Sequence, residues 1–332
     1  MIPSAVVERL TLARQPAEDA LERAADLAAA LVDELRKAVR APLAALESAV
    51  VCLLSGGHLM IEDVPGVGKT VLAKSLARAA GCRFARLQCT ADLLPADVTG
   101  VSVWDQAERT FTFRPGPVFT NMLLVDEVNR ASPKTQSALL ESMEEGQVTV
   151  DGETRRLPRP FMVIATQNPV EYEGTFPLPE AQLDRFALRL SLGYPEARDE
   201  AAMLLDLAAA DPLAAVHPVT GEDGLREAIE AVQDVHLDPA IAAYVVAISG
   251  VTRADPRLVL GASPRAGLTL VRAARARALV EGRDFVLPED VKALAPMVLG
   301  HRLVPGPEAR GRGVSATDVV ADALARVPVP AA

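Results

Sequence analysis

Cysteines, aromatic residues and long hydrophobic runs are all scarce in this sequence. Its 332 residues include three cysteines, none of them in a CxxC pair, and four scattered histidines. This spacing argues against a zinc site or a redox dithiol, so we interpret the cysteines as reduced structural thiols. Aromatic residues make up 4% of the chain while alanine and leucine dominate, which favours helices over an all-β fold.

The apolar stretches are too short to cross a bilayer. The longest, such as AVVCLL at residues 49–54, fall far short of the roughly 20 residues that a transmembrane helix needs. The first residues, MIPSAVVERLTLARQPAED, carry charges too early for a secretory signal. We therefore expect no membrane span and a soluble, cytoplasmic protein.

The chain is acidic, with a net charge of −10. This balance argues against a nucleic-acid partner, because phosphate binding depends on clustered lysine and arginine. One segment, residues 265–283, is basic. A nucleic-acid surface there stays open, but a solvated face or contact with an acidic neighbour subunit is commoner. The segment has no interleaved aromatic residues that would stack on bases.

The length is typical of two domains, and the middle of the chain has the pattern of an α/β fold. Apolar strands alternating with helices predict a parallel sheet that is covered on both faces and binds ligands at the carboxyl ends of its strands. The five strand candidates are HLMIE at 58–62, RFARLQ at 83–88, NMLLVDE at 121–127, FMVIATQN at 161–168 and ALRLSL at 187–192.

Both ends of the chain are predicted to be helical. Residues 16–40 have an apolar face that is expected to pack on the protein's own core, formed by Leu21, Ala24, Ala28, Leu31, Leu35 and Val39. Beyond residue 195, helical segments begin at Ser-Pro, Asp-Pro and Leu-Pro signals. We expect an N-terminal helical extension at 1–40, an α/β core at 41–195 and an all-α domain at 196–332.

Two stretches inside the core interrupt its rhythm. Residues 100–116 and 146–161 each contain two alternating segments around a polar turn, which predicts two β-hairpins. Insertions that a sheet does not need tend to carry function.

A phosphate-binding loop follows the first strand. The stretch IEDVPGVGKT at 61–70 fits the pattern G-x-x-x-x-G-K-[ST] except that Asp63 stands in place of the first glycine. An aspartate tolerates turn conformations, and we expect its side chain to cap amides of the loop. The predicted nucleotide-binding residues are Asp63, Val64, Pro65, Gly66, Val67, Gly68, Lys69, Thr70 and Val71.

The chemistry expected of this loop follows from its residue types. Gly66 and Gly68 let backbone N–H groups converge on an anion at the start of a helix. Lys69 is expected to reach the β and γ phosphates, and the hydroxyl of Thr70 to ligate Mg²⁺.

Polar residues end three further strands. Asp126 and Glu127 follow an apolar strand, where Asp126 is expected to hold Mg²⁺ and Glu127 to polarise the attacking water. Asn168 ends the next strand, placed to approach the γ-phosphate or the water. Gln88 ends the second strand and is a weaker candidate for restraining the catalytic glutamate.

The order of these motifs resembles an AAA+ ATPase of the MoxR family, in the helix-2-insert clade related to magnesium-chelatase-type ATPases. The resemblance covers residues from about 50 to about 303, and its most specific segments are DEVNRASPKTQSALLESMEEGQVTVDG and NPVEYEGTFPLPEAQLDRF. It implies a P-loop NTPase αβα core with a five-stranded parallel sheet followed by a helical lid. ATP and Mg²⁺ would be the ligands, and the two hairpins would match inserts that line the axis of a ring.

The same resemblance assigns two arginines. Arg185 in LDRF matches an arginine finger that reaches the γ-phosphate of the neighbouring subunit. Arg265 in GASPRA matches the sensor-2 arginine, which contacts the nucleotide of its own subunit. One departure concerns the base: relatives carry a valine–glycine pair before the first core helix, whereas KAVRAPLAAL has none. Val39 and Arg40 are candidates to frame the base, or the base binds differently.

Three functional hypotheses remain. The first is a Mg²⁺-dependent ATPase that forms a homo-oligomeric ring, hexameric by family analogy, and remodels a client protein. The family links such rings to maturation of protein complexes or metal-cofactor insertion, with von Willebrand factor A-domain partners. The second is a nucleic-acid-remodelling ATPase. The third is a nucleotide-gated scaffold with little turnover.

Overall fold

The computed structural model describes residues 4–169, 174–198, 200–201 and 211–330. Four residues of the family-specific segment at 168–186 lie outside these ranges, as do short stretches near the start of the lid. Within the described ranges, no helix combines the length and the apolar character that a membrane crossing requires.

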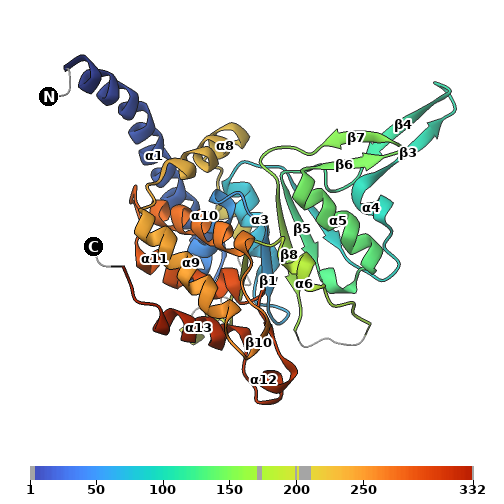
Figure 1. Cartoon of the computed structure of the whole chain (residues 1–332). Helices are drawn as coiled ribbons and strands as arrows, with labels where there is room; N and C mark the ends of the chain where they lie inside the picture. Colours follow the sequence, from blue (N-terminus) through green and yellow to red (C-terminus); the bar gives the residue numbers. More distant parts are fainter. Residues whose placement is uncertain (1–3, 170–173, 199, 202–210, 331–332) are drawn as a thin grey trace.

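A five-stranded parallel sheet forms the centre of the molecule, as predicted (Figure 1). The strand order is β2-β5-β8-β1-β9, and every neighbouring pair is parallel. The strands are β1 (Leu59–Glu62), β2 (Phe84–Gln88), β5 (Met122–Asp126), β8 (Met162–Gln167) and β9 (Leu188–Leu190). The carboxyl ends of all five therefore lie along one edge.

Both faces of the sheet are buried, which explains why its strands are apolar without alternation. Within β5, Met122 and Leu124 belong to one hydrophobic cluster, whereas Leu123 and Val125 belong to another. Successive residues of a strand point to opposite faces. The first cluster includes α2 (Leu43–Leu54), α3 (Lys69–Ala79) and the lid, and the second includes α5 (Pro133–Glu145).

The N-terminal helix α1 (Ser4–Ala38) packs on the body of the protein through its second half. Ala24, Ala28, Leu31 and Leu35 are buried, as is Val39 just beyond the helix, as the sequence pattern predicted. Leu21, also predicted, is partly buried against the same core. The helix contacts α2, α3, α8 (Glu222–Ala231) and α10 (Pro264–Val280), so it bridges core and lid. Its first turns project from the body (Figure 1).

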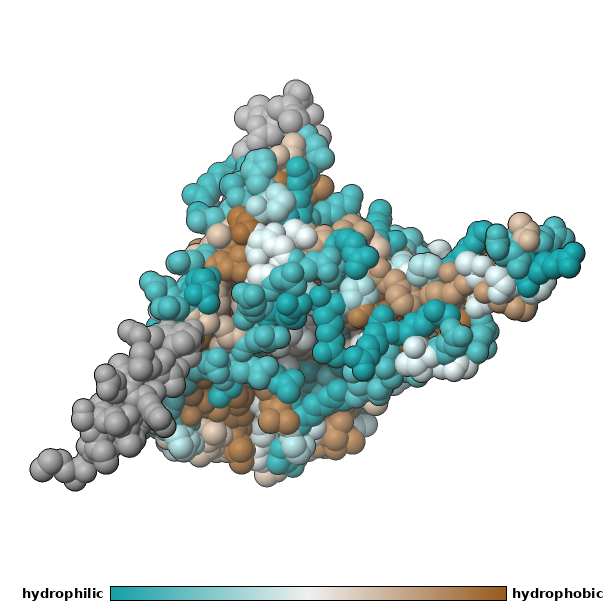
Figure 2. Space-filling view, turned by 90° about the horizontal axis from the view of Figure 1, so that it is seen from above, coloured by the Kyte–Doolittle hydropathy of each residue, from teal (hydrophilic) through white to brown (hydrophobic). Residues whose placement is uncertain are grey.

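Both predicted hairpins are present. The first pairs β3 (Gly100–Asp105) with β4 (Thr110–Pro115) after the short helix α4 (Pro95–Thr99), and the second pairs β6 (Gln147–Val150) with β7 (Glu153–Arg156). The first hairpin extends as an arm to the right of the sheet in Figure 1. Figure 2 shows hydrophilic and hydrophobic residues together along this arm.

The lid is mainly helical, as predicted, with one small addition. Strands β10 (Leu258–Leu260) and β11 (Val304–Pro305) form a two-stranded antiparallel sheet. The predicted helix starts are confirmed, since Asp238 and Ser263 cap helices through bonds from Ala240 N and Ala266 N. The remaining elements are η1 (Val128–Arg130), α6 (Glu180–Leu183), η2 (Pro212–Ala215), η3 (Val232–Asp234), α9 (Pro239–Arg253), α11 (Pro288–Leu299), α12 (Pro307–Gly311) and α13 (Ala316–Arg326).

Two residues after α11 fasten the lid to the start of β9. The guanidinium of Arg302, only 3% exposed, donates to Asp184 Oδ1 at 2.7 Å and to the carbonyl oxygen of Phe186 at 2.6 Å. His301 Nε2 lies 3.0 Å from the same Phe186 oxygen. These buried polar contacts fix the helical domain against the edge strand.

The burial of His301 predicts a pH-dependent stability. Burial, followed by the charge of Arg302, lowers the pKa of His301 to about 3, whereas an unfolded histidine has a pKa of about 6.5. The unfolded chain therefore takes up a proton first. We expect the contribution of His301 to the free energy of unfolding to be undiminished above pH 6.5 and to fall by about 1.4 kcal/mol per pH unit below it. The buried His58, whose pKa burial lowers to about 4, contributes a second slope of the same sign.

Denaturant unfolding between pH 7 and pH 5 checks this expectation. His301→Gln keeps an amide donor for Phe186 and should reduce the slope by about 1.4 kcal/mol per pH unit, while the slope that comes from His58 remains. The matched control, His236→Gln at an exposed histidine, should leave it unchanged. Equal slopes for wild type and His301→Gln would contradict the assignment.

Candidate nucleotide-binding site

The predicted phosphate loop lies between β1 and α3, at the carboxyl edge of the sheet. Gly66 and Gly68 have φ values of 89° and 92°, a conformation that favours glycine. A Cβ added at either position would meet no atom within 4 Å, so space is open on that side of the loop. Gly68 begins α3 without any side-chain cap, and the first amides of the helix are left for an anion.

Lys69 spans the loop from the first turn of α3. Its Nζ donates to the carbonyl oxygens of Asp63 and Val64, the latter at 3.0 Å. Burial lowers the pKa of Lys69, while the carboxylates of Asp63, Asp126 and Glu127 act in the opposite direction. The lysine therefore lies within electrostatic reach of Asp126, the predicted magnesium ligand, and of Glu127, the predicted catalytic carboxylate.

Asp126 ends β5 with both carboxylate oxygens occupied. Oδ2 accepts from Arg86 Nε at 2.7 Å, and Oδ1 accepts from Thr166 Oγ1 at 3.2 Å. Arg86 comes from the neighbouring strand β2 and also donates to Gln88 Oε1 at 3.2 Å. Gln88 therefore contacts Arg86, and not Glu127 as the sequence suggested. Sequence reasoning missed both Arg86 and Thr166.

Glu127 has a left-handed backbone, with φ 55°, which is uncommon for a residue other than glycine and clusters at functional sites. Its amide donates to Thr166 Oγ1 at 3.0 Å, and its Oε2 lies 3.1 Å from Arg130 Nη1. Thr166 thus holds Asp126 and the backbone of Glu127 together. The side chain of Glu127 is about one-third exposed, at 35%, and water can reach it.

Asn168 lies directly after β8, the strand between β5 and β1. Gln167 pairs with Glu62, and the carbonyl oxygen of Gln167 accepts from Asp63 N at 3.1 Å. Asn168 is itself buried, at 8% exposed. The ends of β5, β8 and β1 therefore bring the predicted carboxylates, asparagine and phosphate loop to one edge of the sheet.

Arg185 and Arg265 lie at the opposite edge. Each donates to the carboxylate of Glu144, near the C-terminal end of α5, at 2.9 Å. Arg185 lies just before the amino end of β9. Both arginines line a pocket together with Gly57, which lies just before the amino end of β1. The loop follows the other end of β1, a strand that spans roughly 13 Å. A contact between Arg265 and the nucleotide of its own subunit stays a prediction, and in this structure the guanidinium lies on Glu144 instead.

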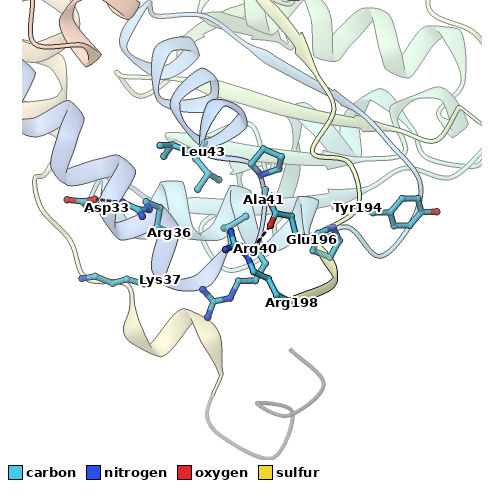
Figure 3. Close-up of a pocket in the computed structure, with 13 residues that line it drawn as sticks. Asp33, Arg36, Lys37, Arg40, Ala41, Leu43, Tyr194, Glu196 and Arg198 are labelled. Carbon is cyan, nitrogen blue, oxygen red and sulfur yellow. Dashed lines mark ion pairs between the residues drawn. The ribbon is translucent and has the colours of Figure 1, made fainter. Parts of the chain in front are cut away.

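A pocket of about 800 Å³ opens between the end of α1 and the segment that follows β9. Its walls are the end of α1, residues 40–43 and residues 194–198 (Figure 3). Val39 and Arg40, the predicted candidates for framing the base, line it together with Tyr194. Gly193 N donates to Asp63 Oδ2 at 2.8 Å, which places the 194–198 wall next to the start of the loop.

Comparisons with known proteins agree with this fold. Residues 58–188 match the model of the ATPase family associated with various cellular activities (AAA), and residues 250–323 match the AAA lid domain. A crystal structure of "a putative ATPase" from Cytophaga hutchinsonii superposes with a TM-score of 0.88 at 34% identity, covering 96% of this chain and 100% of that one.

Two relatives match most of the chain. The "Uncharacterized protein YeaC" of Bacillus subtilis is 49% identical over 281 residues, which are 85% of this chain and 88% of the relative. The "Chaperone MoxR1" of Mycobacterium tuberculosis is 42% identical over 294 residues, covering 86% of this chain and 78% of the relative. The chain therefore belongs to the MoxR family of AAA+ ATPases.

Proposed function

We propose that this protein hydrolyses ATP with Mg²⁺ at the carboxyl edge of its sheet. The observation that carries the proposal is the convergence of Lys69, Asp126, Glu127 and Asn168 on one phosphate loop. In this proposal Lys69 binds the β and γ phosphates. Glu127 accepts a proton from the attacking water, and Asn168 orients that water or the γ-phosphate.

The chemistry of two side chains fits a magnesium ion, one at the end of β5 and one in the first turn of α3. Asp126 supplies a carboxylate and Thr70 a hydroxyl, and oxygen ligands are what Mg²⁺ prefers. When bound, the ion neutralises charge on the phosphates. Arg86, whose Nε lies 2.7 Å from Asp126 Oδ2, would have to release that oxygen first.

The pocket between the end of α1 and the segment that follows β9 is proposed to hold the base. The bond from Gly193 N to Asp63 Oδ2 ties its 194–198 wall to the start of the loop, and its volume of about 800 Å³ is ample for a nucleoside. Val39 and Arg40 would lie on one side of the base and Tyr194 on the other. This seat would replace the valine–glycine contact that the sequence lacks.

The arginines support a ring in which each site is completed by a neighbour. Arg185 and Arg265 share Glu144 at the edge away from their own phosphate loop. A head-to-tail contact that closes into a ring would set this edge against the carboxyl edge of the next subunit. Both arginines would then reach the neighbour's γ-phosphate, which makes Arg265 a residue acting in trans. A hexamer is the ring size we propose.

The biological role proposed is chaperone-like remodelling of a client protein in the cytoplasm. The name "Chaperone MoxR1", printed for the relative that is 42% identical, supports it. Maturation of a protein complex, including insertion of a metal cofactor, is the form that we propose, with a von Willebrand factor A-domain protein as partner. The two hairpins are the elements proposed to face the ring axis.

Nucleotide binding itself is tested by Lys69→Ala. Losing one partner of a desolvated charge pair typically costs about 2–5 kcal/mol, so affinity for Mg·ATP should fall by about 30-fold to several thousand-fold. Titration calorimetry in a Glu127→Gln background measures binding without turnover. The matched control is Arg78→Ala, an exposed cation on the same helix. Unchanged affinity in Lys69→Ala would refute the proposed phosphate site.

A further inference from the structure

Asp63, the residue that departs from the phosphate-loop pattern, is the centre of a hydrogen-bond cluster. It is buried, at 7% exposed. Its Oδ2 accepts from Ser191 Oγ at 2.9 Å, Leu192 N at 2.7 Å and Gly193 N at 2.8 Å. Its Oδ1 accepts from Val64 N at 2.9 Å. The expected cap on a loop amide is present, but three of the four donors come from the end of β9.

These contacts join two walls of the site that are distant in sequence. Residues 191–193 lead directly into residues 194–198, which line the pocket proposed for the base. The backbone of Asp63 is also engaged, since its N–H donates to Gln167 O at 3.1 Å and its carbonyl oxygen accepts from Lys69 Nζ. One residue therefore connects the phosphate loop, strand β8 and the base-side wall.

A glycine would not reproduce this arrangement. Asp63 is not among the residues with positive φ, so the backbone does not require glycine at this position. Without the carboxylate, the amides of Leu192 and Gly193 would lose a charged acceptor, and bonds to charged groups are the stronger ones. Although burial opposes it, bonds from Gly193, Ser191, Leu192 and Val64 lower the pKa of Asp63, which keeps the acceptor ionised at neutral pH.

We propose that Asp63 is a positioning residue that fixes the base-side wall of the pocket against the phosphate loop. Through this link the base and the triphosphate are held as one ligand. The proposal rests on the proposed nucleotide site and adds a specific prediction to it. Loss of the carboxylate should weaken the contribution of the base and leave the contribution of the phosphates.

The test compares two ligands, Mg·ATP and Mg·tripolyphosphate, which lacks base and ribose. Both are titrated into the full-length protein in a Glu127→Gln background. For Asp63→Asn and Asp63→Gly we expect ATP affinity to fall by about 10-fold or more, because a charge-assisted acceptor is lost. The affinity for tripolyphosphate should change less than about threefold, which is the size of the change that a substitution without direct contact to the ligand produces. Asp63→Gly restores the first glycine of the usual phosphate-loop pattern. If Asp63 only stood in for that glycine, this variant would bind ATP as tightly as wild type or more tightly.

Ser191→Ala removes one bond to the same oxygen and gives a milder variant that should fold normally. It should lower ATP affinity by about two- to fivefold, the weight of a single hydrogen bond, again without a matching loss for tripolyphosphate. Equal losses for both ligands, or no loss for ATP, would overturn the role of Asp63. Wild-type protein that binds neither ligand would instead refute the nucleotide site itself.

Discussion

Replacing Glu127 with glutamine is expected to reduce phosphate release by about 100- to 10,000-fold, the usual contribution of a general base. The amide has the size of the carboxylate but cannot accept a proton from water. The backbone at residue 127 is held by Thr166 Oγ1 at 3.0 Å, independently of the side chain. ATP affinity should therefore stay close to that of the wild type while turnover is lost.

Phosphate release at saturating Mg·ATP measures this effect, with ATP binding measured on the same samples. Glu141→Gln, at an exposed position on α5, is the matched control and should keep full activity. Equal rates near background for wild type and Glu127→Gln would favour the nucleotide-gated scaffold. A variant stalled with bound ATP is also the form to use in capturing a client.

The parts of the site that could be predicted from sequence are local. Gly66, Gly68 and Lys69 follow one another in the chain, and the strand before them is apolar, so loop and helix order are encoded within a few residues. The carboxyl ends of parallel strands lie at the same edge of a sheet, independently of the conformation of the loops that connect them. The sequence alone therefore predicts that Asp126 and Asn168 lie at the same edge of the sheet.

The contacts that sequence could not give join residues far apart in the chain. Asp63 meets donors 128–130 positions later, and Thr166 meets Asp126 forty positions earlier. A threonine inside an apolar strand or a serine after one has no local signal. Only the register of β5 beside β8 and of β1 beside β9 brings these side chains together.

The placement of Arg265 shows a second limit of sequence reasoning. Its position at the start of α10 was predictable, since Ser263 and Pro264 mark a helix start. Which edge of the sheet that helix faces depends on how the lid packs, through Arg302 on Asp184 and Phe186. The family resemblance implied a contact in cis, whereas the packing of the lid, which sequence does not give, brings Arg265 and Arg185 to the same carboxylate of Glu144.

Replacing Arg185 with alanine is expected to lower turnover by about a thousandfold or more, the effect of an arginine finger on transition-state charge in related phosphoryl transfer. ATP binding should change less than turnover, because an arginine finger acts mainly on the charge of the transition state. Arg312→Ala, at an exposed arginine of the lid, is the control and should remain active.

Mixing variants separates a finger acting in trans from one acting in cis. A subunit with Arg185→Ala keeps an intact site, and a Glu127→Gln subunit keeps an intact finger. If rings assemble at random from equal amounts, about a quarter of the head-to-tail contacts place the intact finger of a Glu127→Gln subunit at the intact site of an Arg185→Ala subunit. Activity should return to about that fraction of wild type. A mixture no more active than its parts would rule out the finger in trans.

The same mixture made with Arg265→Ala decides the role of the second arginine. An arginine that serves the neighbouring site is supplied by the Glu127→Gln subunit, so activity should return as it does for Arg185. If Arg265 served its own site, the Arg265→Ala subunits would lack it and the Glu127→Gln subunits would lack the glutamate. No subunit would then have a complete site, and no activity should return. Because Glu144 holds both guanidinium groups at 2.9 Å, we expect the two mixtures to behave alike.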